Sequence, residues 1–254
     1  MRRITPTVPG EKRHTARTIC IVLSVLVVVT LTTGSALGKV KFSDDFESGN
    51  LDRWQAVGGE WEIIEVDGNR VARTKGSPDG KFMTLNIRNW AFDNFTMDAR
   101  IWQVSLDQGA NIYFHNDHSH SNPQRHSGYW FGISGAFRAV GWGTIDDGVF
   151  RRWDTQRSAV PLNNWVRLRL EVQGRRATMW MAGDHADDKF QQIFDVINLA
   201  KVIGKHYATG HIGFIATNKE VWVDDVVVTG DGTGLAVDPR ENAAVLWGQL
   251  KRVN

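Results

Sequence analysis

The chain has 254 residues and a formal net charge of +2, with 30 Lys and Arg against 28 Asp and Glu. Residues 1–38 hold five of the basic residues and one of the acidic ones, so the remainder carries a net charge of −2. This balance excludes the broad basic surface that a nucleic-acid partner requires, and no nucleic-acid partner is expected.

The first 38 residues have the order of an export signal. A basic end precedes an apolar run from Ile19 to Val29, and small residues follow up to Gly38. We predict a signal peptide over residues 1–38, cleaved after Gly38. The alternative is an uncleaved membrane anchor, because the apolar run and the residues after it are nearly long enough to cross a bilayer. In either case the rest of the chain is expected to be secreted, periplasmic or at the cell surface, with membrane contact only through this segment.

From position 41 to 229, apolar residues recur with a period of two, which is typical of strands with one buried and one wet face. Trp165–Gln173 is the clearest case, since Val, Leu, Leu and Val alternate with Arg, Arg, Glu and Gln. Asp67-Gly68 and Asp147-Gly148 are predicted hairpin turns, because glycine accepts positive φ without steric cost. Further strands are predicted at 61–66, 92–104, 111–115, 129–134, 137–143, 176–181 and 221–229.

Helical periodicity is nearly absent after the N-terminal segment, and only residues 193–201 and 243–252 are predicted as short helices. Many short strands without alternating helices predict an all-β fold. We therefore expect a two-sheet antiparallel β-sandwich over residues 39–230, preceded by the N-terminal signal or anchor helix. Residues 231–254 are predicted to form a C-terminal tail, entered through the flexible segment Gly230–Gly234.

Several short segments resemble the concanavalin A-like, laminin-G-like jelly-roll superfamily. They contain the sequences FSDDF and NLDRW between positions 42 and 54, NWVRL from position 164, and VDDVVV from position 223. The resemblance spans residues 41–230. Bacterial members of this group include sugar-binding modules and 3-keto-disaccharide hydrolase domains. The resemblance implies a jelly roll in which the first and last strands are neighbours and the concave sheet holds a glycan.

Asp44, Asp45 and Asp224 are the candidate metal ligands. The strand period places Asp224 on the same side as the apolar Val226, where an unpaired carboxylate is costly. Adjacent first and last strands would bring Asp44 or Asp45 close to it, and carboxylate oxygens suit calcium. A structural calcium ion is one prediction. The open alternative is that these aspartates cap turns by accepting backbone N–H bonds.

The segment 115–126 contains half of the eight histidines and is also rich in Asn and Ser. Polar loops at a sheet edge are where jelly rolls of this kind contact sugars, so His115, Asp117 and Arg125 are candidate ligand-binding residues. The alternatives are a solvated loop without a ligand and, as a minor one, a transition-metal site built from the imidazoles.

The chain contains eleven tryptophans, and a flat indole can cover the apolar C–H face of a sugar ring. Candidates for such stacking are Tyr129, Trp130, Trp142 and Trp153, and core packing is the alternative for each of them. Trp142 stands between Gly141 and Gly143, which would leave its faces uncrowded. Five further tryptophans are assigned to the core or the sandwich edge: Trp54, Trp61, Trp102, Trp165 and Trp222. Trp180 is a separate case, because the strand period turns it away from Met179 and Met181.

These observations predict an exported, non-catalytic carbohydrate-binding module. Laminarinase-type hydrolases of this fold carry the motif Glu-x-Asp-x-x-Glu, which supplies their catalytic carboxylates. Glu65 and Asp67 fit the start of this motif, but Arg70 stands at the position of the last glutamate, so the catalytic set is incomplete. One alternative is a hydrolase of the 3-keto-disaccharide type, and another is a cell-surface module that binds protein. For the hydrolase alternative, the candidate catalytic residues are His115, Asp117, His118 and Arg125.

Overall fold

The computed structural model describes residues 40–77, 79–103, 109–117, 125–134, 139–157, 164–185, 187–200, 206–217 and 220–234. The predicted signal or anchor over 1–38, His118 and the chain after position 234 lie outside these ranges. Within the described residues, no helix is both long and apolar enough to cross a membrane.

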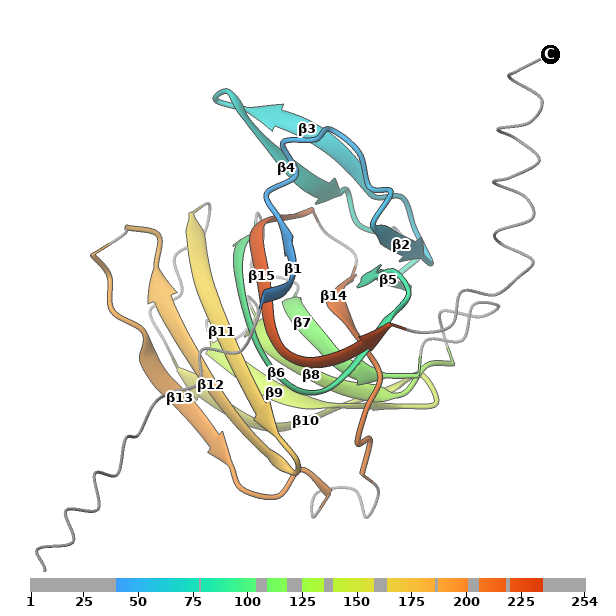
Figure 1. The fold of residues 1–254 in the computed structure, drawn as a ribbon, viewed down its shortest axis with the longest axis vertical. Coiled ribbons are helices and arrows are strands. Elements are labelled where there is room, and N and C mark those ends of the chain that lie inside the picture. The colour runs from blue at the N-terminus through green and yellow to red at the C-terminus, as the bar shows by residue number, and fades with distance from the viewer. Residues whose placement is uncertain are drawn as a thin grey trace, which may run out of the picture. The chain divides into compact units, whose positions relative to one another are not determined.

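The described residues form fifteen strands (Figure 1). The strands in chain order are β1 (Val40–Asp44), β2 (Trp54–Val57), β3 (Glu62–Val66), β4 (Asn69–Thr74), β5 (Phe82–Ile87), β6 (Trp90–Gln103), β7 (Gly109–Asn116), β8 (Gly128–Ser134), β9 (Ala139–Asp146), β10 (Val149–Arg157), β11 (Trp165–Gln173), β12 (Arg176–Gly183), β13 (Gln191–Val196), β14 (His211–Thr217) and β15 (Val221–Gly234). The all-β prediction is confirmed, and β11 has the predicted bounds.

The strands make two antiparallel sheets. Sheet A has the order β13-β12-β11-β6-β15-β4-β3, and β1 also pairs with β15. Sheet B has the order β10-β9-β8-β7-β14-β5-β2. One continuous apolar cluster lies between the two sheets and takes side chains from both, as expected for a sandwich.

The first and last strands are neighbours, as the jelly-roll resemblance implies. Ser43 of β1 pairs with Val227 of β15, and Asp44 pairs with Val226. The last strand continues beyond the predicted boundary at 230, because Gly232 and Gly234 pair with β6. Gly230–Gly234 is therefore part of sheet A, and its interpretation as a flexible exit is wrong.

The two predicted hairpin turns are confirmed. Asp67 and Gly68 have φ values of 52° and 83° between β3 and β4, and Asp147 and Gly148 have values of 49° and 79° between β9 and β10. Two consecutive positive φ values are the signature of the turn that best matches the twist of antiparallel strands.

The helix predicted at 193–201 is wrong at its start, because residues up to Val196 belong to β13. Phe194 is buried and Ile193 half-buried, whereas Gln192 and Asp195 are exposed. A short segment of this kind fits a strand as well as one helical turn, and pairing with β12 decides in favour of the strand.

The two sheets differ in how their faces are buried. In β11 of sheet A, buried residues alternate with partly exposed ones, so the face away from the core is wet. In β7 and β9 of sheet B, nearly every residue is buried, whichever way it points. Sheet B therefore has a second covered face.

Candidate functional site

The face of sheet B that points away from the core carries a mixed polar and apolar layer. Strand alternation places Met83, Leu85, Ala110 and Ile112 in the core, so the residues between them point the other way. We define the outer layer as the buried side chains on this second face: Thr84, Asn86, Asn111, Tyr113, Trp130, Ile145 and Ile215. Thr84, Asn86 and Asn111 are polar, and three polar residues among seven buried ones is a high share.

Trp130 anchors this layer by reaching across a whole strand. Its indole N–H, on β8, donates to the carbonyl oxygen of Arg151 on β10, at 3.1 Å. The ring passes over Gly143 of β9, where a Cβ would lie 2.7 Å from the ring and would overlap the Arg151 carbonyl oxygen. The Phe150 ring then stacks on the indole, with centroids 4.5 Å apart and planes at 18°. The space left by Gly143 therefore serves Trp130 rather than Trp142.

Two partly exposed rings cover the layer. Phe150 is 38% exposed, and it stacks on Phe82 with centroids 6.2 Å apart. Phe82 also contacts the ring of His126 at 5.6 Å. Sequence reasoning missed both phenylalanines. Phe150 lies in β10, which is exposed along its whole length and shows no apolar period.

Several buried polar atoms at the layer have no hydrogen-bond partner among the described residues. They are the Tyr113 hydroxyl, both ring nitrogens of His126, Asn116 Oδ1 and Thr84 Oγ1. Buried polar groups are paired in the great majority of cases, so a group of unpaired ones requires an explanation. A polar ligand that enters the layer would supply the missing partners.

Burial sets the protonation of the two titratable groups. It lowers the pKa of His126 to about 4, so its imidazole is neutral at pH 7. It raises the pKa of Tyr113 well above the usual value, so the phenol keeps its proton. The two rings lie 5.0 Å apart between centroids. The site thus holds an uncharged acceptor beside an uncharged donor.

The predicted aromatic group does not gather at one place. Tyr129 and Trp142 point into the core between the sheets and are at most 5% exposed, so a sugar could not stack on them in this structure. Trp130 belongs to the outer layer. Trp153 lies on β10 and is 38% exposed, and its indole N–H donates to Thr144 Oγ1 at 3.0 Å.

The predicted polar loop has mainly structural contacts in its described part. His115 is buried, with Nδ1 2.7 Å from the Tyr207 carbonyl oxygen and Nε2 3.0 Å from that of Asp93. Burial lowers its pKa to about 4, although both carbonyl contacts act in the opposite direction. Asp117 accepts the Ser127 backbone N–H at 2.6 Å.

Arg125 is exposed and forms an ion pair with Asp147 at 3.4 Å, close to the turn before β10. Exposed pairs of this kind contribute little to stability. Of the residues predicted in the polar loop, the structure therefore brings none of the described ones into the outer layer. His126, the last histidine of the segment, is the one that reaches it.

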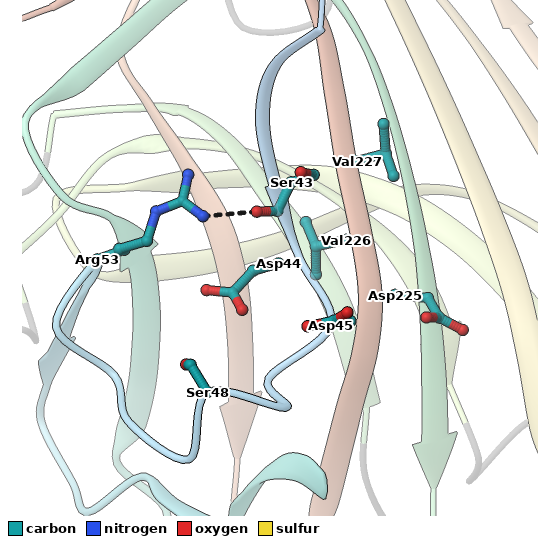
Figure 2. Close-up of a pocket in the computed structure, with 8 residues that line it drawn as sticks. All are labelled: Ser43, Asp44, Asp45, Ser48, Arg53, Asp225, Val226 and Val227. Atoms are coloured by element: carbon teal, nitrogen blue, oxygen red, sulfur yellow. Dashed lines mark hydrogen bonds between the residues drawn. The ribbon is translucent and has the colours of Figure 1, made fainter. Parts of the chain in front are cut away.

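The carboxylate of Asp44 is held by N–H donors. Its Oδ2 accepts the Trp54 indole N–H at 2.8 Å, and its Oδ1 accepts the Phe46 backbone N–H at 3.0 Å. Asp45 accepts the Glu47 backbone N–H at 3.2 Å. Figure 2 shows Asp44 at the end of β1 and Asp45 directly after it, with Asp225 on the other side of the β15 ribbon.

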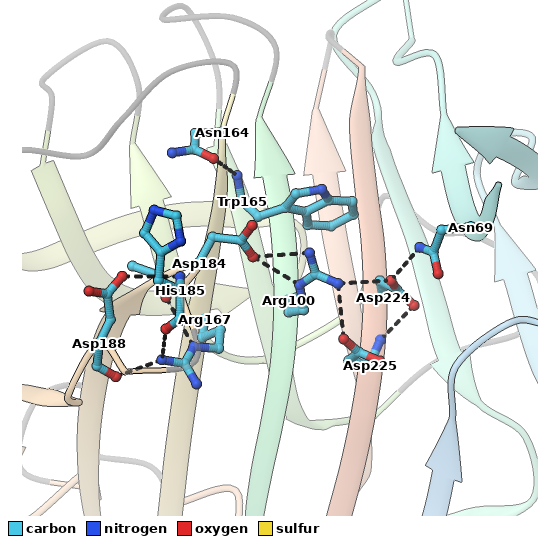
Figure 3. A network of polar contacts seen from close by, with 11 residues as sticks. Asn69, Arg100, Asn164, Trp165, Arg167, Asp184, His185, Asp188, Asp224 and Asp225 are labelled. Carbon is cyan, nitrogen blue, oxygen red and sulfur yellow. Dashed lines mark hydrogen bonds and ion pairs between the residues drawn. The ribbon is translucent and has the colours of Figure 1, made fainter. Parts of the chain in front are cut away.

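Asp224 is buried and is also satisfied by donors (Figure 3). Its Oδ2 accepts from Asn69 at 2.8 Å and from Arg100 at 3.3 Å, while the guanidinium also pairs with Asp184 and Asp225. Burial raises the pKa of Asp224 to about 6, even though Asn69 and Arg100 act to lower it. N–H donors directed at these oxygens do not fit a cation site.

No group of three or more His, Cys, Asp or Glu within the described ranges is arranged to hold a metal ion. The contacts of Asp44, Asp45 and Asp224 favour the alternative in which aspartates hold turns and strands together. Calcium binding at these positions stays a prediction.

Three tryptophans lie outside the core, contrary to their assignment from sequence. Trp165, Trp102 and Trp222 are cross-strand neighbours on the outer face of sheet A and are partly exposed. Trp102 stacks on Trp222 at 5.2 Å, and the Arg100 guanidinium lies over Trp165 at 4.6 Å (Figure 3). These rings cover one another and so stabilise the sheet.

Comparison with protein families identifies one match. The model of a family described as the 3-keto-alpha-glucoside-1,2-lyase-like domain matches residues 41–229. No curated protein matches the chain.

Similar solved structures share the fold at low sequence identity. A Bacillus subtilis protein of unknown function with a galectin-like fold has a TM-score of 0.59 and 12% identity, over 76% of this chain and 96% of that one. The carbohydrate-binding module CBM66 from Bacillus subtilis has a TM-score of 0.53 and 14% identity, over 70% and 96%. The VIP36 exoplasmic/lumenal domain, bound to Ca²⁺ and Man3GlcNAc, has a TM-score of 0.50 and 11% identity, over 77% and 90%. Together with the family match, these likenesses in fold confirm the predicted concanavalin A-like jelly roll.

We predict that Asp44→Ala lowers the free energy of unfolding by about 1–3 kcal/mol, because the buried Trp54 indole loses its acceptor. The control Asp45→Ala removes an exposed carboxylate and should change it by less than about 0.5 kcal/mol. Denaturant titration measures both.

A chelator should leave the melting temperature of the wild type unchanged. If it lowers that temperature and Asp44→Ala abolishes the effect, the calcium prediction stands instead.

We predict that Gly143→Ala destabilises the domain by about 1–3 kcal/mol and displaces Trp130, because the added methyl overlaps the indole and the Arg151 carbonyl. Gly141→Ala is the matched control, since its nearest contacts would be at 3.1 Å or more and its effect should be smaller. Denaturant titration and near-UV circular dichroism check the prediction. Equal losses for the two variants would contradict the packing role of Gly143.

Proposed function

The chain belongs to the 3-keto-alpha-glucoside-1,2-lyase-like domain family, and from this premise we propose that it binds a carbohydrate on the outer face of sheet B. The observation that carries the proposal is the outer layer itself. The Tyr113 hydroxyl and Thr84 Oγ1 in this layer, and the His126 ring nitrogens beside it, are buried and lack partners among the described residues. The carboxylate oxygens of Asp44 and Asp224 are all engaged. Unpaired donors and acceptors beside aromatic rings are what a sugar needs.

The aromatic part of the site is the stack of Phe150 on Trp130. Phe150 presents one partly exposed ring, and its other face is held against the indole. A ring fixed in this way loses little side-chain freedom when a sugar packs on it. The stack therefore provides a preorganised apolar platform at the border of the polar layer.

The polar part of the site lies beneath Phe82. A ligand that reaches the His126 nitrogens and the Tyr113 hydroxyl must shift the Phe82 ring, which is only partly buried. The gain is several hydrogen bonds to groups that are already dehydrated. Hydroxyl groups suit these partners, because each can both donate to an imidazole nitrogen and accept from a phenol.

Proteins with a similar fold support the ligand class. CBM66 is a carbohydrate-binding module by its name, and the VIP36 domain was solved with mannose-containing ligands. We extend this ligand class to the present chain on the basis of the outer layer. We also propose that the domain works outside the cytoplasm, because the N-terminal 38 residues have the composition of an export signal or anchor.

We predict that Phe150→Ala weakens glycan binding about tenfold or more, because the sugar loses its platform and Trp130 is left without its covering ring. A glycan array followed by calorimetry on the best ligand measures the affinity. Trp180→Ala is the matched control, since Trp180 is a partly exposed aromatic residue on sheet A. Loss of binding in the control with none in Phe150→Ala would place the site on the other sheet.

A second candidate function is cleavage of a 3-keto glycoside, which the family description and the neutral His126–Tyr113 pair favour. A proton on C2, next to the C3 ketone, would pass to His126. The C1–C2 double bond then forms as the C1–O bond breaks, and the leaving oxygen takes the Tyr113 proton. Solvent returns the proton from His126 to Tyr113, so the balance closes without an oxidant or a metal ion.

This candidate predicts release of the leaving group from a 3-keto disaccharide. His126→Gln should lower the rate at least about 100-fold, because no acceptor of equal basicity replaces the imidazole. Glu171→Gln on sheet A should leave it unchanged. Product analysis by chromatography and mass spectrometry measures both. Glycan binding without any release from the keto-sugar would exclude the enzyme and leave the binding module.

A further inference from the structure

Asn116 is joined to the outer layer by a bridge of two side-chain amides. It is the last residue of β7, whereas Asn86 lies on β5, and β14 runs between these two strands. The Asn116 Nδ2 donates to Asn86 Oδ1 at 3.1 Å, so this hydrogen bond spans β14 from one side chain to the other. Both residues are fully buried.

Two glycines allow the close packing around this bridge. A Cβ at Gly213 of β14 would lie 2.6 Å from Asn86 Cα, so a larger residue would displace the strand that carries Asn86. A Cβ at Gly128 of β8 would lie 2.9 Å from Asn116 Cβ and 3.0 Å from the Tyr113 ring. Asn116 and Tyr113 therefore both pack against Gly128, which places the amide beside the phenol of the proposed sugar site.

The hydrogen bonds fix the orientation of the Asn116 amide. Its Nδ2 also donates to the backbone carbonyl oxygen of His211, at 3.0 Å. A backbone carbonyl can only accept, so the NH₂ end of the amide must face it. The two N–H hydrogens are then used by His211 and Asn86. Asn116 Oδ1 is left as a buried acceptor with no partner among the described residues.

Asn116 Oδ1 differs from the other unpaired atoms at the outer layer, because its role cannot change. The hydroxyl groups of Tyr113 and Thr84 rotate, and each can donate or accept. The neutral imidazole of His126 can exchange its tautomer. The Asn116 amide cannot turn over without losing its hydrogen bonds to His211 and Asn86. The layer thus adapts to donors and acceptors, except at Asn116, where a ligand must donate.

We infer that Asn116 is a specificity-determining residue of the sugar site and that it requires a free hydroxyl group on the ligand. The inference rests on the proposed carbohydrate function. The ligand hydroxyl donates to Asn116 Oδ1, whereas a deoxy position leaves this oxygen unpaired and an ether or ketone brings only another acceptor against it. A site built to hydrogen-bond a hydroxyl rejects analogues that lack it, because its own buried polar group stays unpaired. A 3-keto sugar must therefore turn its ketone away from Asn116.

The first test uses the purified wild-type chain with methyl α-glucoside, methyl α-mannoside and methyl α-galactoside, and with their monodeoxy and monodeoxyfluoro analogues. Fluorine can accept weakly but cannot donate. At one position of the best-bound sugar, both analogues should bind at least about tenfold more weakly than the parent, as measured by NMR titration.

Two results of this titration would overturn the inference. If fluorine restores the affinity wherever the deoxy analogue loses it, the ligand hydroxyl acts as an acceptor. If none of the three parent sugars binds, the inference fails, and the glycan array decides separately whether the proposed function fails with it. Binding of a parent sugar without any hydroxyl penalty removes only the role of Asn116.

The second test assigns the hydroxyl to its partner. Asn116→Leu removes the acceptor, so it should bind the parent sugar at least about tenfold more weakly and should no longer distinguish it from the deoxy analogue at that position. Gln192→Leu, which replaces an exposed amide on β13 of sheet A, is the control and should keep both the affinity and the penalty.

A penalty that persists in Asn116→Leu shows that another residue contacts this hydroxyl and overturns the inference. Circular dichroism checks that the variant is folded, because the substitution also removes the donor to His211 and Asn86. If the variant does not fold, the comparison of deoxy and fluoro analogues on the wild type still decides.

Discussion

The hydrogen bond from the Trp130 indole to the Arg151 carbonyl is the contact on which the architecture of sheet B depends. It ties β8 to the edge strand β10 across β9, so the edge is held by a side chain as well as by the backbone ladder. It is possible only because Gly143 leaves room for the ring. It also gives Phe150 a flat surface to stack on. One glycine and one indole thus create both the covered face and its aromatic border.

The two outer faces of the sandwich handle polar groups in opposite ways. On sheet A, Arg100 pairs with three aspartates, and Arg167 donates to the carbonyl oxygens of His185 and Asp188 (Figure 3). This network is closed, and it joins the strands that carry it. On sheet B the outer layer holds groups such as the Tyr113 hydroxyl without a partner among the described residues. A fully paired network stabilises a fold, whereas a buried group without a partner carries a free-energy cost.

The sequence predicts sheet A far better than sheet B. The bounds of β11 are predicted correctly because one of its faces is exposed to solvent. Buried Val and Leu therefore alternate with polar residues, and this pattern identifies a strand. In β8, both Tyr129 and Trp130 are buried, so the period of two cannot tell which ring faces the core. The Asp-Gly turns are predictable because positive φ is a local property of the backbone.

The candidate site depends on long-range packing that leaves little trace in the sequence. The sequence suggests that Gly143 makes room for its neighbour Trp142. In the structure, the space beside Gly143 is filled by the Trp130 ring of β8. His115 adopts a φ of 48° at the end of β7, which breaks the strand period just where the polar loop begins. Asn116 therefore turns toward Asn86 and the outer layer, while His115 is fixed by two carbonyls. The positive φ of His115 thus places Asn116 at the outer layer, where the period of two would place His115.

The unpaired polar atoms at the outer layer carry a free-energy cost that the rest of the fold must offset. Each buried group without a partner costs about 1–3 kcal/mol, and at least four residues contribute such atoms. A fold of marginal stability could not tolerate that cost unless other contacts offset it. The continuous cluster between the sheets and the closed network on sheet A supply those contacts. A ligand that forms hydrogen bonds with these atoms would remove the free-energy cost of leaving them unpaired. Its binding would therefore also stabilise sheet B.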